Sequence, residues 1–108
     1  MNKLVYCAHS HKSIFLSQVI ALFVLDRGDI PIDPFMVLPP TLLDTIDLDK
    51  EGRLKLDLCI LSKCDYLYVF GEISEGVLTE IDWWQQHRTH RIMQRFEWDK
   101  VLKVIECF

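Results

Sequence analysis

Apolar and polar positions alternate in blocks along the chain, and the blocks predict strands and helices in turn. Short runs rich in β-branched and aromatic residues predict strands, and longer runs with helical spacing of apolar residues predict helices. The expected strands and helices are listed in order: strands 3–8, 30–33, 66–71 and 92–96, and helices 12–26, 51–64, 75–88 and 100–107, the last capped by Asp99. Residues 34–50, with Pro39 and Pro40, are expected to form a long connecting loop after the second strand.

The order of these elements predicts the fold class. Strands that alternate with helices form a parallel sheet with helices packed on its faces. We expect one α/β domain over residues 1–108, a three-layer Rossmann-like or flavodoxin-like fold whose small sheet has four strands in the order 2-1-3-4. Ligands of such sheets bind outside the carboxyl ends of the strands, where the strand order reverses. The segments after Ala8, Ile32 and Phe70 should meet there.

Composition and charge restrict the kinds of partner. The chain has 108 residues, half of them apolar, and a net charge of −4, which argues against nucleic-acid binding. The longest apolar run, residues 14–25, is too short to span a bilayer, and the N-terminal residues lack a secretory signal pattern. We therefore expect a cytoplasmic protein with no membrane partner.

The four cysteines, at positions 7, 59, 64 and 107, form no CxxC pair. We expect free, buried thiols in a reducing compartment, because a metal or redox site would need a different spacing. The sequence thus predicts no metal and no organic cofactor.

The segment after the first strand is a candidate anion site. Tyr6 lies in that strand, and Ser10 and Lys12 stand at the entry to the first helix. Free backbone N–H groups at a helix N-terminus attract anions, and a hydroxyl and an ammonium group add to the attraction. The same residues also fit a helix cap and a solvated lysine. His9 and His11 are candidate ligands or acid/base groups, although a loop histidine is more often neither.

Glu80 is the first candidate for chemistry. It lies in the segment SEGVLTE, residues 74–80, where Ser74 can cap a helix and Gly76 can allow a ligand to approach the backbone. Trp83 and Trp84 follow, and an aromatic ring beside a carboxylate can raise its pKa. The alternative is a solvated helix glutamate beside core tryptophans.

Asp57 is the second candidate. It stands at the margin of the leucine face of the expected helix 51–64, so it points either to solvent or into a cleft. Arg53, four residues earlier, could pair with it as an ordinary surface contact.

These residues together resemble the nucleoside 2-deoxyribosyltransferase-like family. That family includes transferases that move deoxyribose between bases and hydrolases that cleave the N-glycosidic bond of deoxynucleoside 5′-monophosphates. The resemblance covers residues 3–85. The matching pieces are Tyr6 with Ser10 and Lys12 after it, Asp57 eight residues before Asp65, the strand DYLYVFG, and the pattern S-x-G-x-x-x-E at 74–80.

The resemblance implies a role for each matching residue. Glu80 would be the nucleophile that attacks the anomeric carbon, Asp57 the acid/base group, and Tyr6 the residue that positions the nucleophile or sugar. Gly76 would let the backbone approach the ligand. The residues at the positions that hold a 5′-phosphate in the hydrolase branch are Ser10, Lys12 and Ser74.

The expected function is therefore cleavage or transfer of the glycosidic bond of a nucleoside or nucleotide, in a homodimer or larger assembly. Three alternatives stay open: a nucleotide-binding module without catalysis, an enzyme that cleaves NAD, and a protein-interaction subunit. The interaction surface would use the tryptophans and the basic segment 87–95, which could instead be a solvated helix end. Its basic residues are His87, Arg88, His90, Arg91 and Arg95.

Overall fold

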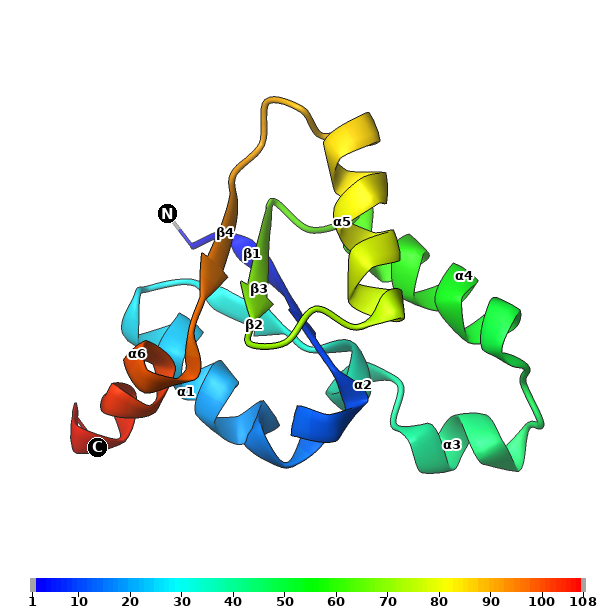
Figure 1. Ribbon diagram of the computed structural model, residues 1–108, viewed down its shortest axis with the longest axis horizontal. Helices are drawn as coiled ribbons and strands as arrows, with labels where there is room; N and C mark the ends of the chain where they lie inside the picture. Colours follow the sequence, from blue (N-terminus) through cyan, green and yellow to red (C-terminus); the bar gives the residue numbers. More distant parts are fainter. Residues whose placement is uncertain (1, 108) are drawn as a thin grey trace.

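A computed structural model describes residues 2–107 and has a parallel sheet between two layers of helices (Figure 1). The strands are β1 (Leu4–His9), β2 (Ile30–Ile32), β3 (Tyr66–Phe70) and β4 (Met93–Phe96). All pairings are parallel, and the order is β2-β1-β3-β4. The fold class and the strand order predicted from the sequence are confirmed.

Alternate residues of the central strand β1 face opposite helix layers. Val5 and Cys7 pack in one apolar cluster with α1 (Ser17–Asp26) and α6 (Trp98–Leu102). Tyr6 and Ala8 pack in the other cluster, with α4 (Lys50–Leu61) and α5 (Glu75–His87). Figure 1 shows the two helix pairs on opposite sides of the sheet. Because side chains alternate along a strand, Tyr6 is directed to the same side as α5.

The segment expected to be a long loop contains two short helices, so that prediction is wrong. They are α2 (Pro34–Val37) and α3 (Pro40–Thr45). The Asp33 carboxylate caps α2 by accepting a hydrogen bond from the Phe35 N–H, at 2.9 Å. Proline stands in the first turn of both helices, where its missing N–H would have no helical partner in any case.

Both terminal helices also differ from expectation. The first begins as a 3-10 helix, η1 (His11–Leu16), which is kinked at Ser13 and is followed directly by α1. The last begins at Trp98 with Glu97 as its N-cap residue, so the expected cap at Asp99 is wrong. A second 3-10 helix, η2 (Lys103–Cys107), follows α6.

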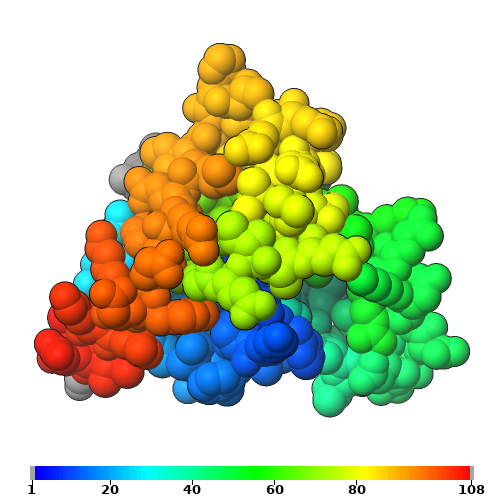
Figure 2. All heavy atoms as spheres, viewed as in Figure 1, coloured from blue at the N-terminus to red at the C-terminus, as the bar shows by residue number. Residues whose placement is uncertain are grey.

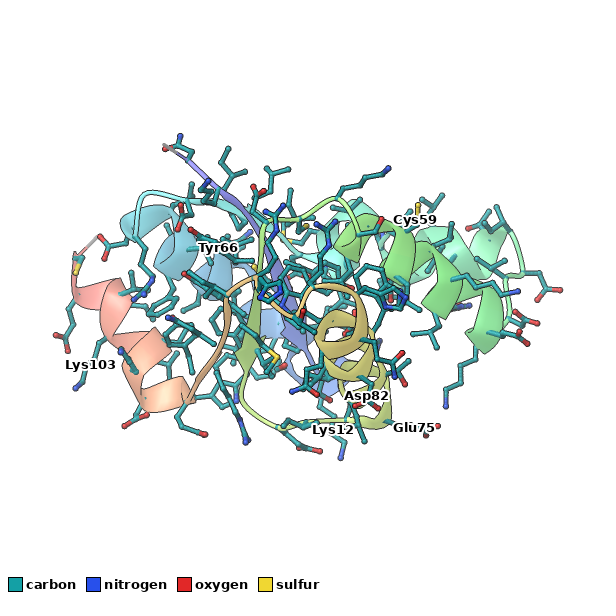
Figure 3. All side chains as sticks on the ribbon, turned by 90° about the horizontal axis from the view of Figure 1, so that it is seen from above. Lys12, Cys59, Tyr66, Glu75, Asp82 and Lys103 are labelled. Atoms are coloured by element: carbon teal, nitrogen blue, oxygen red, sulfur yellow. The ribbon has the colours of Figure 1, made fainter. Side chains whose placement is uncertain are left out.

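The cysteines are free, but only two of them are buried. Cys7 and Cys64 lie in the core, whereas Cys59 and Cys107 are exposed, so the expected burial is wrong for those two. Figure 3 labels Cys59 on the outer side of α4. Across residues 2–107, no helix has the length and apolar character needed to cross a membrane.

The basic segment after α5 is held against the body of the protein. Arg88 donates to the Ser62 carbonyl, Arg91 pairs with Asp65 at 3.4 Å, and Arg95 donates to the Gly71 carbonyl at 3.1 Å. His87 and His90 are exposed. Arg88 is half-buried, so a purely solvated helix end does not describe it. Arg91 and Arg95 make their contacts while they remain exposed.

Gly71, in the turn between β3 and α5, should not tolerate a side chain. Its φ is +69°, and an added Cβ would lie 2.2 Å from the Trp98 indole nitrogen. We expect Gly71→Ala to lower the free energy of unfolding by about 3 kcal/mol, from backbone strain and the clash together. Gly28→Ala is the matched control, because Gly28 has φ +85° with nothing within 4 Å of an added Cβ, and it should cost about 1 kcal/mol. Urea denaturation measures both, and equal losses would contradict the role of Trp98.

Candidate functional site

A cleft of about 560 Å³ lies at the carboxyl edge of the sheet, on the side of α4 and α5. Its walls come from the start of η1, from α2, from α4 and from the first half of α5. Figure 2 shows the surface hollowed where the segments near residues 10, 50 and 75 meet. This is the edge at which parallel sheets of this type bind ligands.

The structure brings the seven site residues predicted from the sequence to this one place. Tyr6 lies behind the cleft wall on β1 and contacts Glu80. The other six line the cleft: Ser10, Lys12, Asp57, Ser74, Gly76 and Glu80.

Glu80 is buried, with 6% of its surface exposed, and the Tyr6 hydroxyl donates a hydrogen bond to its Oε2. The pKa of Glu80 is raised to about 8, because burial raises it by more than the hydrogen bond from Tyr6 lowers it. Burial, together with the charge of Glu80, holds the pKa of Tyr6 far above its usual range, so Tyr6 keeps its proton and remains the donor. The solvated-helix alternative for Glu80 does not fit this burial.

Asp57 is half-buried on α4 and lines the cleft opposite α5. Burial raises its pKa to about 6, and the charge of Asp33 adds to the shift. The neighbouring Arg53 pairs with Asp44 instead, at 2.5 Å, so the surface pair expected between Arg53 and Asp57 is wrong. At neutral pH the cleft thus contains two carboxyl groups that can gain or lose a proton, as general acid–base catalysis requires.

The rim of the cleft has hydroxyl and ammonium groups. Ser10 Oγ accepts from the Lys12 N–H at 3.2 Å, and Ser74 Oγ accepts from the Val77 N–H at 3.3 Å, which leaves both hydroxyl protons free to donate. Lys12 is exposed, and its Nζ lies 4.0 Å from Glu72. Figure 3 labels Lys12 on the same side of the molecule as Glu75, with which it borders the cleft. Such a rim suits an anionic group on a ligand.

A family model described as a domain of unknown function (DUF7768) matches residues 5–94. The chain belongs to the DUF7768 family. No curated protein matches the chain. The DUF7768 match runs from β1 into β4 and includes every residue that lines the cleft. The cleft therefore lies wholly within the part of the chain that the DUF7768 model covers.

The DUF7768 cleft also has a polar pair that sequence reasoning missed. His9, at the end of β1, contacts Asp33, which follows β2, with Nε2 2.7 Å from Oδ2. Both side chains are buried. Only a partial signal was present in the sequence, because His9 and Asp33 each directly follow an apolar strand residue at the carboxyl edge of the sheet. Within residues 2–107, no group of three or more His, Cys, Asp or Glu side chains has the arrangement of a metal site.

Proposed function

We propose that this protein cleaves or transfers the N-glycosidic bond of a nucleoside or nucleoside 5′-monophosphate. The observation that carries the proposal is the hydrogen bond from Tyr6 to the buried carboxyl of Glu80, in a cleft that Asp57 also lines. Tyr6 and Glu80 lie 74 positions apart in the sequence. Their contact agrees with the roles that the resemblance to nucleoside 2-deoxyribosyltransferases implies.

In the proposed reaction an oxygen of Glu80 attacks the anomeric carbon of the sugar. The carbon–nitrogen bond breaks, its electron pair goes to the base, and Asp57 gives the base a proton. Water or a second base then attacks the same carbon and gives a proton to the ionised Asp57, and the bond to Glu80 breaks to release the carboxylate. The transition states resemble an oxocarbenium ion, so a carboxylate against the sugar stabilises them in both steps.

Tyr6 has a supporting role in this proposal. Its donated hydrogen bond occupies one oxygen of Glu80 and fixes the orientation of the carboxyl group, which leaves the other oxygen to face the sugar. The same bond favours the ionised form of Glu80 that the attack requires.

The rim groups would bind a 5′-phosphate. Ser10, Lys12 and Ser74 offer donors there, and Ser74 also stands at the N-terminus of α5. Gly76 lies in the first turn of α5, where backbone N–H groups have no partner within the helix, and it lines the same cleft. Binding energy from the phosphate would hold the sugar in place over Glu80.

The order of the two pKa values supports a second assignment of roles. Glu80, with a pKa of about 8, is mostly protonated at pH 7, whereas Asp57, with a pKa of about 6, is mostly ionised. In this assignment Glu80 protonates the base and Asp57 activates a water molecule that attacks the sugar directly. The two assignments differ in one species, because only the first forms a covalent bond between the sugar and Glu80.

The test is incubation with a panel of nucleosides, ribo- and deoxynucleoside 5′-monophosphates and NAD, with free base measured by chromatography. We expect base release from at least one nucleoside or monophosphate, and mass spectrometry of the quenched reaction should find the sugar on Glu80 in the first assignment. Release of nicotinamide alone would favour the NAD-cleaving alternative. Binding of a nucleotide without release of base from any of these compounds would favour the nucleotide-binding module without catalysis and contradict the proposal.

Gly76 gives a separate test of close approach by the ligand. An added Cβ there meets no atom within 4 Å, and the residue lines the cleft. Gly76→Ala should therefore leave folding intact or stabilise α5 by about 0.5–1 kcal/mol, because alanine favours the helix. If the phosphate approaches the backbone here, the KM for monophosphates should rise about tenfold or more. An unchanged KM would place the ligand elsewhere in the cleft.

A further inference from the structure

A buried polar cluster borders the cleft and has no part in the proposed reaction. His9, which lines the cleft, contacts Asp33 there, with His9 Nε2 2.7 Å from Asp33 Oδ2 and with side chains only 0% and 3% exposed. The other ring nitrogen, Nδ1, lies 3.0 Å from the hydroxyl of Ser13. A charge that is so fully removed from water needs a partner of opposite sign and complete hydrogen bonding.

The hydrogen bonds determine the protons on this cluster. The Ser13 hydroxyl donates its one proton to the Ser10 carbonyl at 2.8 Å, so it accepts from His9 Nδ1. Asp33 accepts from the Phe35 N–H through Oδ1 and from His9 Nε2 through Oδ2. In this arrangement of protons both ring nitrogens of His9 donate, as they do in an imidazolium, and the pair with Asp33 is then neutral overall.

This neutrality matters to the cleft because His9, which contacts Asp33, lines the same cleft as Glu80 and Asp57. The negative charge of Asp33 contributes to the raised pKa of Asp57 and to that of Glu80, after burial in each case. An unpaired carboxylate at this place would push both groups further toward their protonated forms. A positive charge on His9, in direct contact with Asp33, opposes that effect.

We propose that His9 is a positioning residue whose imidazolium cancels the charge of Asp33, so that the carboxyl groups of Glu80 and Asp57 face a neutral neighbour. The inference rests on the proposed function for its catalytic meaning, but the charge compensation itself does not depend on any substrate. It adds His9, Asp33 and Ser13 to the residues that decide how the cleft works.

The other ionisable groups near His9 do not replace this compensation. His11, on η1, contacts the same Phe35 ring as His9, with ring centroids 5.6 Å apart, but it is exposed. Lys12 is also exposed and lies near Glu72. On β1, Tyr6 and Cys7 both keep their protons, because burial raises the pKa of each above its usual value. The elements α2 and β3 adjoin His9, and their only ionisable side chains are the tyrosines of β3.

The experiment is a carbon-13 NMR titration of the Glu80 side chain in the wild type and three variants. His9→Gln keeps a donor toward Asp33 but removes the positive charge, and it should raise the midpoint of the Glu80 titration by about 1 pH unit. Asp33→Asn should lower the midpoint. The double variant His9→Gln with Asp33→Asn should return it to within about 0.3 pH units of wild type, since both charges are then gone.

The control is His90→Gln, because His90 is exposed in the turn before β4, away from the cleft, and should leave the midpoint unchanged. An unchanged midpoint in His9→Gln would overturn the inference. If His9→Gln does not fold, long-range proton–nitrogen NMR of the wild type decides, because two protonated ring nitrogens on His9 at pH 7 are required and one would refute the proposal.

Activity provides the second arm. For a substrate that releases base, kcat/KM at pH 7 should fall about tenfold in His9→Gln and recover in the double variant, whereas a purely structural role would make the double variant the worst of the three. Should the wild type cleave no nucleotide, the proposed function fails while the NMR titration still judges the charge compensation.

Discussion

Glu80→Gln is expected to lower base release at least about 10³-fold and, at the same time, to make the protein more stable at alkaline pH. Glutamine has the shape of the carboxyl group and can still accept the hydrogen bond from Tyr6. It cannot ionise and cannot bond covalently to the sugar. Chromatographic assay of free base measures the first effect, and thermal or urea unfolding at several pH values measures the second.

The sign of the stability effect follows from the raised pKa of Glu80. Its pKa rises from 4.5 to about 8 on folding, so between these values the folded state binds more protons than the unfolded state. The contribution of Glu80 to the free energy of unfolding is therefore fully present below pH 4.5 and is lost as the pH rises through 8. We expect Glu80→Gln to exceed the wild type by on the order of 4 kcal/mol at pH 9 and by little at pH 5.

The control for both effects is Asp82→Asn, which changes an exposed carboxylate on the same helix outside the cleft. It should change neither base release nor the pH dependence of unfolding. If the gain in stability of Glu80→Gln over the wild type is no larger at pH 9 than at pH 5, the result would contradict the burial of Glu80. Full activity in that variant would remove Glu80 from the reaction.

Asp57→Asn is expected to reduce base release about 10²–10⁴-fold for ordinary bases, because an amide cannot give the leaving base a proton. The loss should be much smaller for a substrate whose base is already cationic, such as a 7-methylguanine nucleotide, since that base leaves without a proton. In the wild type, activity on ordinary bases should be greatest between about pH 6 and pH 8, because the reaction needs Glu80 ionised and Asp57 protonated. It should decline below pH 6 and above pH 8.

The matched control is Glu51→Gln on the same helix, where Glu51 is exposed and pairs with Lys55. It should leave the rates on both kinds of substrate unchanged. Equal losses of Asp57→Asn on ordinary and cationic bases would exclude a general-acid role. Such a result would favour the assignment in which Asp57 activates water, because that step is needed for every leaving group.

The sheet could be predicted because its strands are apolar runs with strong β preference. The segment 66–70 has no charged residue, and the observed strand occupies those positions. The two helices in 34–45 were missed although Asp33 and Pro34 form a recognisable cap and first turn. The prolines favour a loop, and helices of four and six residues leave almost no periodicity to detect.

Only part of the candidate site could be predicted from the sequence. Glu80 and Asp57 could be chosen because their neighbours and spacing resemble a known family, but spacing does not say that Tyr6 reaches Glu80 across 74 residues. The sequence puts His9 and Asp33 at the same edge of the sheet but does not show that they meet. Their contact spans 24 residues and depends on the register of β1 and β2. Contacts between strand ends follow from tertiary structure, which local patterns do not contain.

The position of Trp98 over Gly71 has a practical consequence. The indole stands against the turn that leads into α5, and it borders a second hollow that shares Ser10 and Lys12 with the cleft. Indole emission responds to the polarity and motion of its surroundings, so a ligand that engages Ser10 or Lys12 should change the fluorescence of Trp98. The unlabelled protein thus has its own optical reporter, with which binding and a single turnover can be followed in a stopped-flow instrument.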